Sequence, residues 1–379
     1  MRMSGRLPAW VEYGLLPVLN LLAALLLSGV VVRIMGESPW AALKLMAAGA
    51  FGAQDSIGYT LFYSTNFIFT GLAVAVAYHA GLFNIGGEGQ AYLGGLGAGL
   101  VGLACGGWPT WVVLPLGIAA AAAFGAGWAF VPAWLQARRG SHIVITTIMF
   151  NFIASALMTY LLVNVLINPG QQSPETRAFG PHASMPAVSD LLARVGIPYA
   201  PSPLNVSTLL ALAACFLVWV LIWKTPWGFA VRTAGRNPSA AVYAGISPAR
   251  ATIQAMLVSG ALAGCLGVNE LLGSQHRIVL DFPEGAGFVG IAVALMGRNH
   301  PAGIIVSALL FGALYQGGSQ ISFDMPRINR DMVVVIQGLV IVFCGALENM
   351  FRAPIAALFA RARPPAAAPG GSPAVTPSR

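Results

Sequence analysis

Charged residues are scarce in this sequence. Only 8% of its 379 residues are Asp, Glu, Lys or Arg, while 57% are hydrophobic, whereas a soluble domain carries about 25% charged residues. The mean hydropathy is correspondingly high, at +0.75. Because so few charges cannot cover the surface of a soluble domain of this length, the composition predicts an integral membrane protein that lies in a lipid bilayer.

Lysine, histidine and cysteine are too few or too scattered for several kinds of chemistry. The only lysines are Lys44 and Lys224, and neither lies in the glycine-rich loop ending in Ser or Thr that binds nucleotide phosphates. The five histidines form no pair at metal-ligand spacing. The four cysteines stand alone in or beside apolar runs, which favours packing roles over a disulfide or zinc framework. We therefore predict that the chain is not an enzyme and binds no metal or other cofactor.

The net charge of +8 is the only feature that favours a nucleic-acid partner. The basic residues are scattered between apolar runs and form no stripe with interleaved aromatic residues. They are better interpreted as signals at the ends of membrane spans, so we predict no nucleic-acid partner.

Apolar runs predict an all-α, polytopic membrane protein of about ten transmembrane helices. The domains that follow are a cytoplasmic N-terminus (1–13), a first transmembrane half (14–168), an external loop (169–203), a second half (204–351) and a disordered cytoplasmic tail (352–379). With both termini inside, 13 of the 20 Lys and Arg residues lie on the cytoplasmic side, including those of the basic segment 225–250.

The two predicted halves contain five spans each, and an odd number forces the second half to insert upside down relative to the first. Such inverted repeats are common in transporters and place broken helices at the centre. A weak internal echo agrees with this arrangement: glycine-rich residues 87–90 precede Trp-Pro at 108–109, and glycine-rich residues 285–288 precede His-Pro at 300–301.

The most unusual stretch is 81–99, in which eight glycines surround Asn84, Glu88 and Gln90. Each glycine costs a helix about 1 kcal/mol relative to alanine, and an acid at membrane depth costs about 2.5–3.5 kcal/mol. Irregular backbone is tolerated in a membrane only where protein buries it or water reaches it. The stretch therefore predicts a broken helix that lines a cavity. On a continuous helix, Asn84 and Glu88 would share one face.

Further polar residues lie in the predicted spans. Thr147 and Asn151 are four residues apart in the fifth span, and Asn269 and Glu270 end the seventh. Gln275, His276, Asp281 and Glu284 follow. Together with Asn84, Glu88, Gln90 and an aromatic surface such as Phe288, these groups can bind a neutral polar ligand such as a sugar or nucleoside.

Structural roles compete with this interpretation. Asn, Gln and Thr side chains in membrane helices often serve as hydrogen bonds between helices, which applies to Asn84, Gln90, Thr147 and Asn151. Glu270 is alternatively a docking contact at the outer interface.

The basic segment predicts a short cytoplasmic helix. Asn237 is a suitable N-cap, Pro238 occupies the first helical position and Gly245 provides the stop. Because so short a helix has little stability alone, a docking partner is expected, although a helix lying on the bilayer surface is the simpler alternative. The candidate contacts are Arg232, Arg236, Asn237, Ala240, Tyr243 and Gly245.

Three stretches, 81–90, 232–246 and 290–303, resemble the permease subunits of nucleoside and simple-sugar ABC importers, in the same superfamily as the ribose and branched-chain amino acid permeases. Residues 147–151 resemble the fifth-span motif of that family. The resemblance implies a type II importer fold in a bacterial inner membrane. Its implied partners are a second homologous permease, ABC ATPase subunits that carry ATP and Mg, and an external substrate-binding lipoprotein.

By that resemblance Asn84, Glu88 and Gln90 lie beside the translocation path, and 232–246 is the coupling helix in the ATPase groove. The expected function is ATP-driven alternating access for a nucleoside or simple sugar. Two alternatives stay open: a permease for branched-chain amino acids or another small polar solute, and an ion-coupled secondary transporter that uses Glu88.

Overall fold

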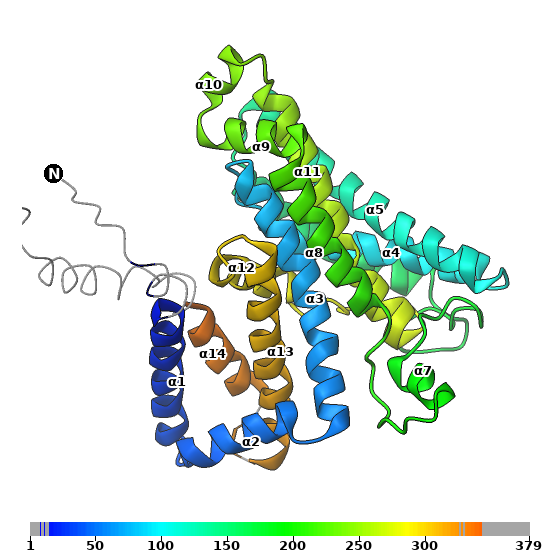
Figure 1. The fold of residues 1–379 in the computed structure, drawn as a ribbon. Helices are drawn as coiled ribbons and strands as arrows, with labels where there is room; N and C mark the ends of the chain where they lie inside the picture. The colour runs from blue at the N-terminus through cyan, green and yellow to red at the C-terminus, as the bar shows by residue number, and fades with distance from the viewer. Residues whose placement is uncertain (1–7, 9–10, 12–14, 326, 329, 343–379) are drawn as a thin grey trace, which may run out of the picture.

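The computed structural model describes residues 8, 11, 15–325, 327–328 and 330–342, and its named elements are all helices (Figure 1). In chain order they are α1 (Leu16–Ile34), α2 (Pro39–Phe51), α3 (Gln54–His79), α4 (Gly87–Cys105), α5 (Thr110–Arg139), α6 (Ile143–Tyr160), η2 (Leu161–Val165), α7 (Val188–Arg194), α8 (Ser207–Lys224), α9 (Pro226–Arg236), α10 (Pro238–Tyr243), α11 (Pro248–Gly264), η3 (Val268–Gln275), α12 (Ala286–Met296), α13 (Pro301–Asp324) and α14 (Arg330–Ile341).

The chain is a multi-pass membrane protein. Within the described residues, six helices are long and apolar enough to cross a bilayer, and a seventh span is possible where α1 and α2 form a pair bent by 118°. The ten predicted spans exceed this number because the helices at three of them do not reach the required length or hydropathy within the described residues. Glycines and the polar residues Glu88 and Gln90 lower the hydropathy of α4, α12 has only 11 residues, and α14 is described only to Ile341. Most of 1–13, the end of the tenth span and the tail 352–379 lie outside the described residues.

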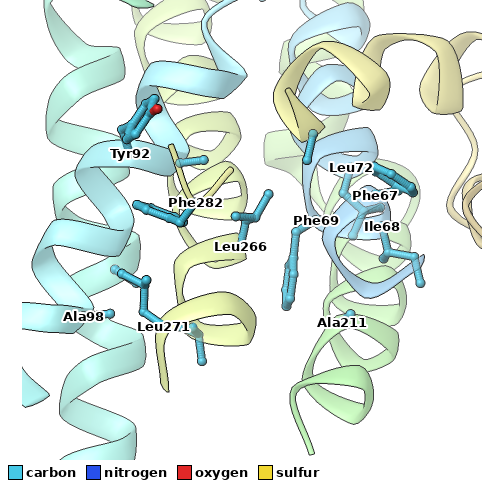
Figure 2. Packing of buried hydrophobic residues seen from close by; sticks show 14 of the residues in the cluster. Phe67, Ile68, Phe69, Leu72, Tyr92, Ala98, Ala211, Leu266, Leu271 and Phe282 are labelled. Atoms are coloured by element: carbon cyan, nitrogen blue, oxygen red, sulfur yellow. The ribbon is translucent and has the colours of Figure 1, made fainter. Parts of the chain in front are cut away.

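Helix α3 lies at the centre of the packing, with 89% of its most apolar stretch buried. It packs against α8, α11, α12 and α13, and its buried face carries Phe69 and Leu72, which are fully covered. Figure 2 shows Phe69 beside Leu266, which lies between α11 and η3. The core is therefore built around one apolar helix that is covered on several sides.

Small residues allow α4, α5 and α11 to pack backbone to backbone. A Cβ atom added to Gly94 would lie 2.2 Å from the Cα atom of Gly264, and one added to Gly125 would lie 2.2 Å from the carbonyl oxygen of Gly260. Glycine at these crossings permits the close approach that drives helix association in membranes.

A non-helical segment, residues 276–285, joins η3 to the short helix α12 and runs alongside α4. A Cβ added to Gly99 would meet Ile278, one added to Gly95 would meet Phe282, and the start of α12 meets the start of α4 at Gly287. The Phe282 ring also packs edge-on against Tyr92 of α4, with ring centroids 5.5 Å apart (Figure 2). Residues 276–296 therefore consist of a non-helical segment followed by a short helix.

The polar loop 169–203 covers part of that non-helical segment. Backbone bonds join Thr176 N to Ile278 O at 3.0 Å and Phe179 N to His276 O at 2.8 Å, and Thr176 is buried. These bonds satisfy backbone groups that no helix satisfies. The loop also contains the short helix α7, which has no buried residues. In Figure 1, α7 and α10 lie at opposite ends of the molecule.

Candidate functional site

The side chain of Glu88, on α4, connects this helix to the start of α12. Its carboxylate accepts hydrogen bonds from the backbone N–H groups of Gly285, at 2.9 Å to Oε1, and Gly287, at 2.8 Å to Oε2. These amides lie at the start of α12, where the helix dipole favours negative charge and the N–H groups have no partner within the helix. The acid of α4 thus caps the neighbouring half-helix.

The expectation that Asn84 and Glu88 share a helical face is wrong, because α4 begins only at Gly87. The Asn84 Oδ1 atom accepts a bond from Gly86 N at 2.8 Å, which holds the chain in a turn. Its Nδ2 group donates to Gln90 Oε1 and to Ser259 Oγ of α11, both at 2.9 Å. Asn84 therefore holds the irregular segment 80–86 against α11, while Glu88 contacts α12.

Asn151 of α6 braces the same turn. Its Oδ1 atom accepts a bond from Gly89 N, and its Nδ2 group donates to Ile85 O, both at 2.9 Å. Thr147, one turn earlier, donates to the carbonyl of Ile143 at 2.8 Å. Hydrogen bonds within the chain therefore involve all four of these buried residues, Asn84, Gln90, Thr147 and Asn151. The alternative of a structural role for them predicts such bonds.

Asn269 and Glu270 lie on the π-helix η3 and are both buried. Asn66 of α3 connects them, since its Nδ2 group donates to Glu270 Oε1 at 2.5 Å and its Oδ1 atom accepts from Asn269 Nδ2 at 2.8 Å. Asn205 and Ser207, where α8 begins, donate to Asn269 Oδ1. Glu270 is thus held within a buried network in this conformation.

Sequence reasoning missed Asn66 as a member of this network. The available signal was a polar triplet, Ser64, Thr65 and Asn66, inside the apolar run of α3. Such a triplet indicates a buried polar contact in a membrane helix, but it does not identify the partner.

The segment that leads into α12 exposes acids and an aromatic ring. Asp281, Glu284 and Phe288 are all exposed. The Tyr92 hydroxyl of α4 donates to Asp281, and the Tyr315 hydroxyl of α13 donates to Glu284 Oε2 at 2.6 Å. Because neither non-helical backbone nor exposed acids can face lipid tails, this face meets water or another protein. We call residues 281–288 the acidic face.

The basic segment forms two helices, α9 and α10, rather than one. The break lies at Asn237, whose Oδ1 atom accepts from Ala240 N at 3.1 Å and so caps α10, and Pro238 begins that helix. Gly245 follows with φ +75°. The predicted cap, first residue and stop are therefore confirmed. Tyr243 is 94% exposed at the tip, and the Ala240 side chain is also exposed.

Helix α9 approaches the end of α3 closely enough for main chain to meet main chain. A Cβ added to Gly235 would lie 2.4 Å from the carbonyl oxygen of His79, and one added to Gly81 would lie 2.8 Å from the carbonyl oxygen of Gly235. Gly81 also has φ +74°, which a residue with a side chain adopts only with strain. The basic segment thus rests on the chain that leads into α4.

The fold and the residues at the junction of α4 and α12 together indicate a class of protein. The chain has multiple spans, and two helices that follow non-helical segments, α4 and α12, meet at their N-termini beside exposed acids. Interrupted helices of this kind are typical of transport proteins. Among the residues that the structure describes, no three His, Cys, Asp or Glu side chains lie close enough to share a metal ion.

The chain belongs to the family described as branched-chain amino acid transport system / permease component, whose model matches residues 56–345. It is therefore the permease component of an ABC transporter and not itself an enzyme. It is 35% identical to a glucose ABC transporter permease protein of Haloferax volcanii, over 89% of this chain and 88% of the relative. Two guanosine ABC transporter permease proteins of Bacillus subtilis also match: one at 35% identity over 87% of this chain and 92% of its own length, the other at 28% over 67% and 78%. No solved structure matches.

Proposed function

We propose that this chain carries a neutral polar solute, a nucleoside or a simple sugar such as glucose, into the cell by ATP-driven alternating access. The acidic face is the observation that carries the proposal, because exposed acids on non-helical backbone require an aqueous path or a protein partner at membrane depth. Relatives named for guanosine and for glucose support the solute class.

The path lies along the acidic face, with Phe288 as an exposed aromatic surface and Glu270 behind it. Asn84, Gln90, Thr147 and Asn151 border the path from the inside and hold the broken helix in place. Glu88 has a bracing role, because both of its oxygens accept backbone bonds. This arrangement supports a cap on α12 and gives no support to an ion-coupled mechanism in which Glu88 binds the ion.

The chain works with three kinds of partner. A second related permease completes the path across the acidic face, in line with the two related guanosine permease proteins of Bacillus subtilis. ABC ATPase subunits, which hold ATP and Mg, bind α9 and α10 through Arg232, Arg236, Ala240 and Tyr243. A substrate-binding lipoprotein delivers the solute from outside. The exposed tip of α10 supports this coupling route, as does the contact of Gly235 on α9 with Gly81, on the segment that leads into α4.

The spans form two inverted halves of five, residues 14–168 and 204–351, with both termini on the cytoplasmic side of a bacterial inner membrane. Reciprocal packing supports the inversion: α5 packs on α11 as α13 packs on α3, and α4 packs on α11 as α12 packs on α3. The N-termini of α4 and α12, which correspond under this symmetry, meet at Gly87 and Gly287.

Copurification from detergent tests the proposal. Tagged chain, expressed with its neighbouring genes, is expected to retain an ATPase subunit, and solute-loaded binding protein is expected to stimulate ATP hydrolysis in nanodiscs. Ala240→Arg introduces a bulky charge on the exposed side of α10 and should reduce the retained ATPase at least tenfold. Ala193→Arg, an equally exposed change on α7, should retain it. A chain that purifies without any ATPase under these conditions would contradict the proposal.

A further inference from the structure

An apolar groove of about 590 Å³ lies between α1, α2, α13 and α14. Its surface is almost entirely hydrocarbon, and its lining includes Leu22 and Val30 of α1, Leu43 of α2, Ile321 of α13 and Ile336 of α14. A second apolar cavity of about 150 Å³ continues the groove between α2 and α13. The volume of the groove lies within the range of small-molecule sites, so it has room for a ligand.

The inside of the groove offers little to a polar ligand. Ser28 is the one hydroxyl side chain among the described lining residues, and it already donates to the carbonyl of Ala24 at 2.8 Å. A sugar or nucleoside hydroxyl would lose its bonds to water there without replacement, which costs about 1–3 kcal/mol for each group. The occupant of the groove is therefore apolar along most of its length.

The groove has the length of one leaflet of a bilayer. Along α1 its lining extends from Leu22 to Arg33, which at 1.5 Å per residue is about 16 Å. The hydrocarbon core of a bilayer is about 30 Å thick, so the groove covers about half of it. The elbow, residues 35–38, is where α1 turns by 118° into α2. It lies at the end of the molecule opposite α10, level with the start of α3 and the end of α13 (Figure 1). The groove therefore runs from the bilayer surface to its middle.

The polar end of the groove lies at the elbow. Arg33 is the one charged residue among the described lining residues, it is exposed, and Trp40 also lines the groove. The Lys44 ammonium lies 5.4 Å from the centroid of the Trp40 ring. Tryptophan is enriched at membrane surfaces, where Lys and Arg also anchor spans. The acids Glu37 and Asp324 lie on neighbouring segments, but Arg33 has no ion-pair partner among the side chains that the structure describes.

The width of the groove favours a thin occupant over a helix. One turn of an α-helix is 10–12 Å across and 5.4 Å high, so it fills about 400–600 Å³. A helix of a partner subunit would thus use the whole volume for one turn, although the groove is about three turns long. A hydrocarbon chain is thinner and can follow the groove from end to end.

We propose that the groove binds a phospholipid of the surrounding membrane, with an acyl chain along α1 and its phosphate at Arg33. A guanidinium group forms charge-assisted hydrogen bonds with phosphate oxygens, and the acyl chain covers apolar side chains that the protein leaves open. The bound lipid connects α1 and α2 to α13 and α14. The inference depends on the position of the chain in a membrane and not on the identity of the transported solute.

Photo-crosslinking tests the site in the tagged chain together with the subunits that copurify with it. The nanodiscs consist of dioleoylphosphatidylglycerol with a small fraction of the same lipid that carries a diazirine in the middle of one acyl chain. Labelled peptides are identified by mass spectrometry. We expect labelling of residues 22–46 to exceed that of the exposed faces of α6 and α8 about tenfold. Equal labelling of all these helices would indicate ordinary contact with the bilayer and would overturn the site.

Val30→Trp distinguishes the groove from the outer surface of α1. The larger side chain should fill the groove, so labelling of residues 22–46 should fall about tenfold. Val163→Trp, at a similarly exposed position of η2 that is not among the described lining residues, should leave the labelling unchanged. If Val30→Trp does not reach the membrane, Leu26→Trp replaces it. Undiminished labelling in the folded variant would contradict binding in the groove.

Arg33→Gln tests the position of the phosphate. Native mass spectrometry of the detergent-purified protein should show phospholipid retained by the wild type, and Arg33→Gln should reduce this retention about threefold. Arg194→Gln, the same change at an exposed position of α7, should not reduce it. Equal retention in the wild type and Arg33→Gln would overturn the assignment of the phosphate to this residue.

Other occupants of the groove would give different results. If the groove is labelled in the chain alone but not in the transporter with its copurified subunits, a partner subunit covers it. If it is labelled in neither, another segment of this chain fills it. Either result would overturn the lipid site and leave the proposed transport function untouched.

Discussion

Two sets of polar side chains lie in the middle of this chain, and their surroundings differ. Asn84, Gln90 and Asn151 are buried around the start of α4, where they hydrogen-bond to backbone or to one another. Asp281 and Glu284 lie on exposed, non-helical chain. The first set stabilises the irregular start of α4, and the second set lies on the exposed surface of the chain. A polar side chain in the middle of a membrane protein can therefore have either a structural or a surface role, and whether the side chain is buried distinguishes the two.

The largest effect is expected at the junction that both sets share. In Gly287→Val, the added Cβ would lie about 2.2 Å from the backbone nitrogen of Glu88. Because backbone cannot yield as a side chain does, we expect a loss of about 3 kcal/mol of stability, together with loss of the Glu88 cap. Folded yield and thermal stability in detergent measure it. Gly127→Val on α5, where an added Cβ meets nothing within 4 Å, is the matched control. Equal stability of the two variants would contradict the close junction.

A smaller loss is expected in the buried set. Asn151→Ala leaves Gly89 N–H and Ile85 C=O without their partner, which we expect to lower stability by about 1–3 kcal/mol. The KM of the remaining folded transporter should stay near the wild-type value. Ser155→Ala, one turn further along α6, should have little effect on either quantity. A large KM change without a loss of thermal stability would instead place Asn151 in contact with solute.

The smallest change in stability is expected on the acidic face. Asp281→Asn keeps an acceptor for the Tyr92 hydroxyl and alters an exposed group, so stability should change by less than about 0.5 kcal/mol. Uptake should nevertheless fall several-fold, whereas Asp190→Asn on α7 should leave uptake unchanged. If Asp281→Asn unfolds the protein, the distinction between buried amides that stabilise the fold and exposed acids that do not is wrong.

Local features could be predicted from the sequence because they depend on neighbouring residues. The Asn237 cap and Pro238 start of α10, and the break before α4, follow from residue preferences within one turn. The prediction that Asn84 and Glu88 share one face was wrong because a spacing of four residues places two side chains on one face only within a continuous helix. Periodicity within α3 did not indicate that Asn66 pairs with Glu270, 204 residues away, since such pairs depend on how distant helices pack.

The contact between Gly235 and Gly81 has a mechanical consequence. Between most packed helices, side chains change rotamer and absorb small displacements. Here main chain rests on main chain, with less than 3 Å between a hypothetical Cβ and the opposing carbonyl oxygen. A displacement of α9 would therefore displace Gly81 as well. Because residues 80–86 form a short connection, the start of α4 would move with them, and few side chains could absorb the displacement. A stiff connection of this kind converts a small movement at one end of the molecule into a movement of nearly the same size at its centre.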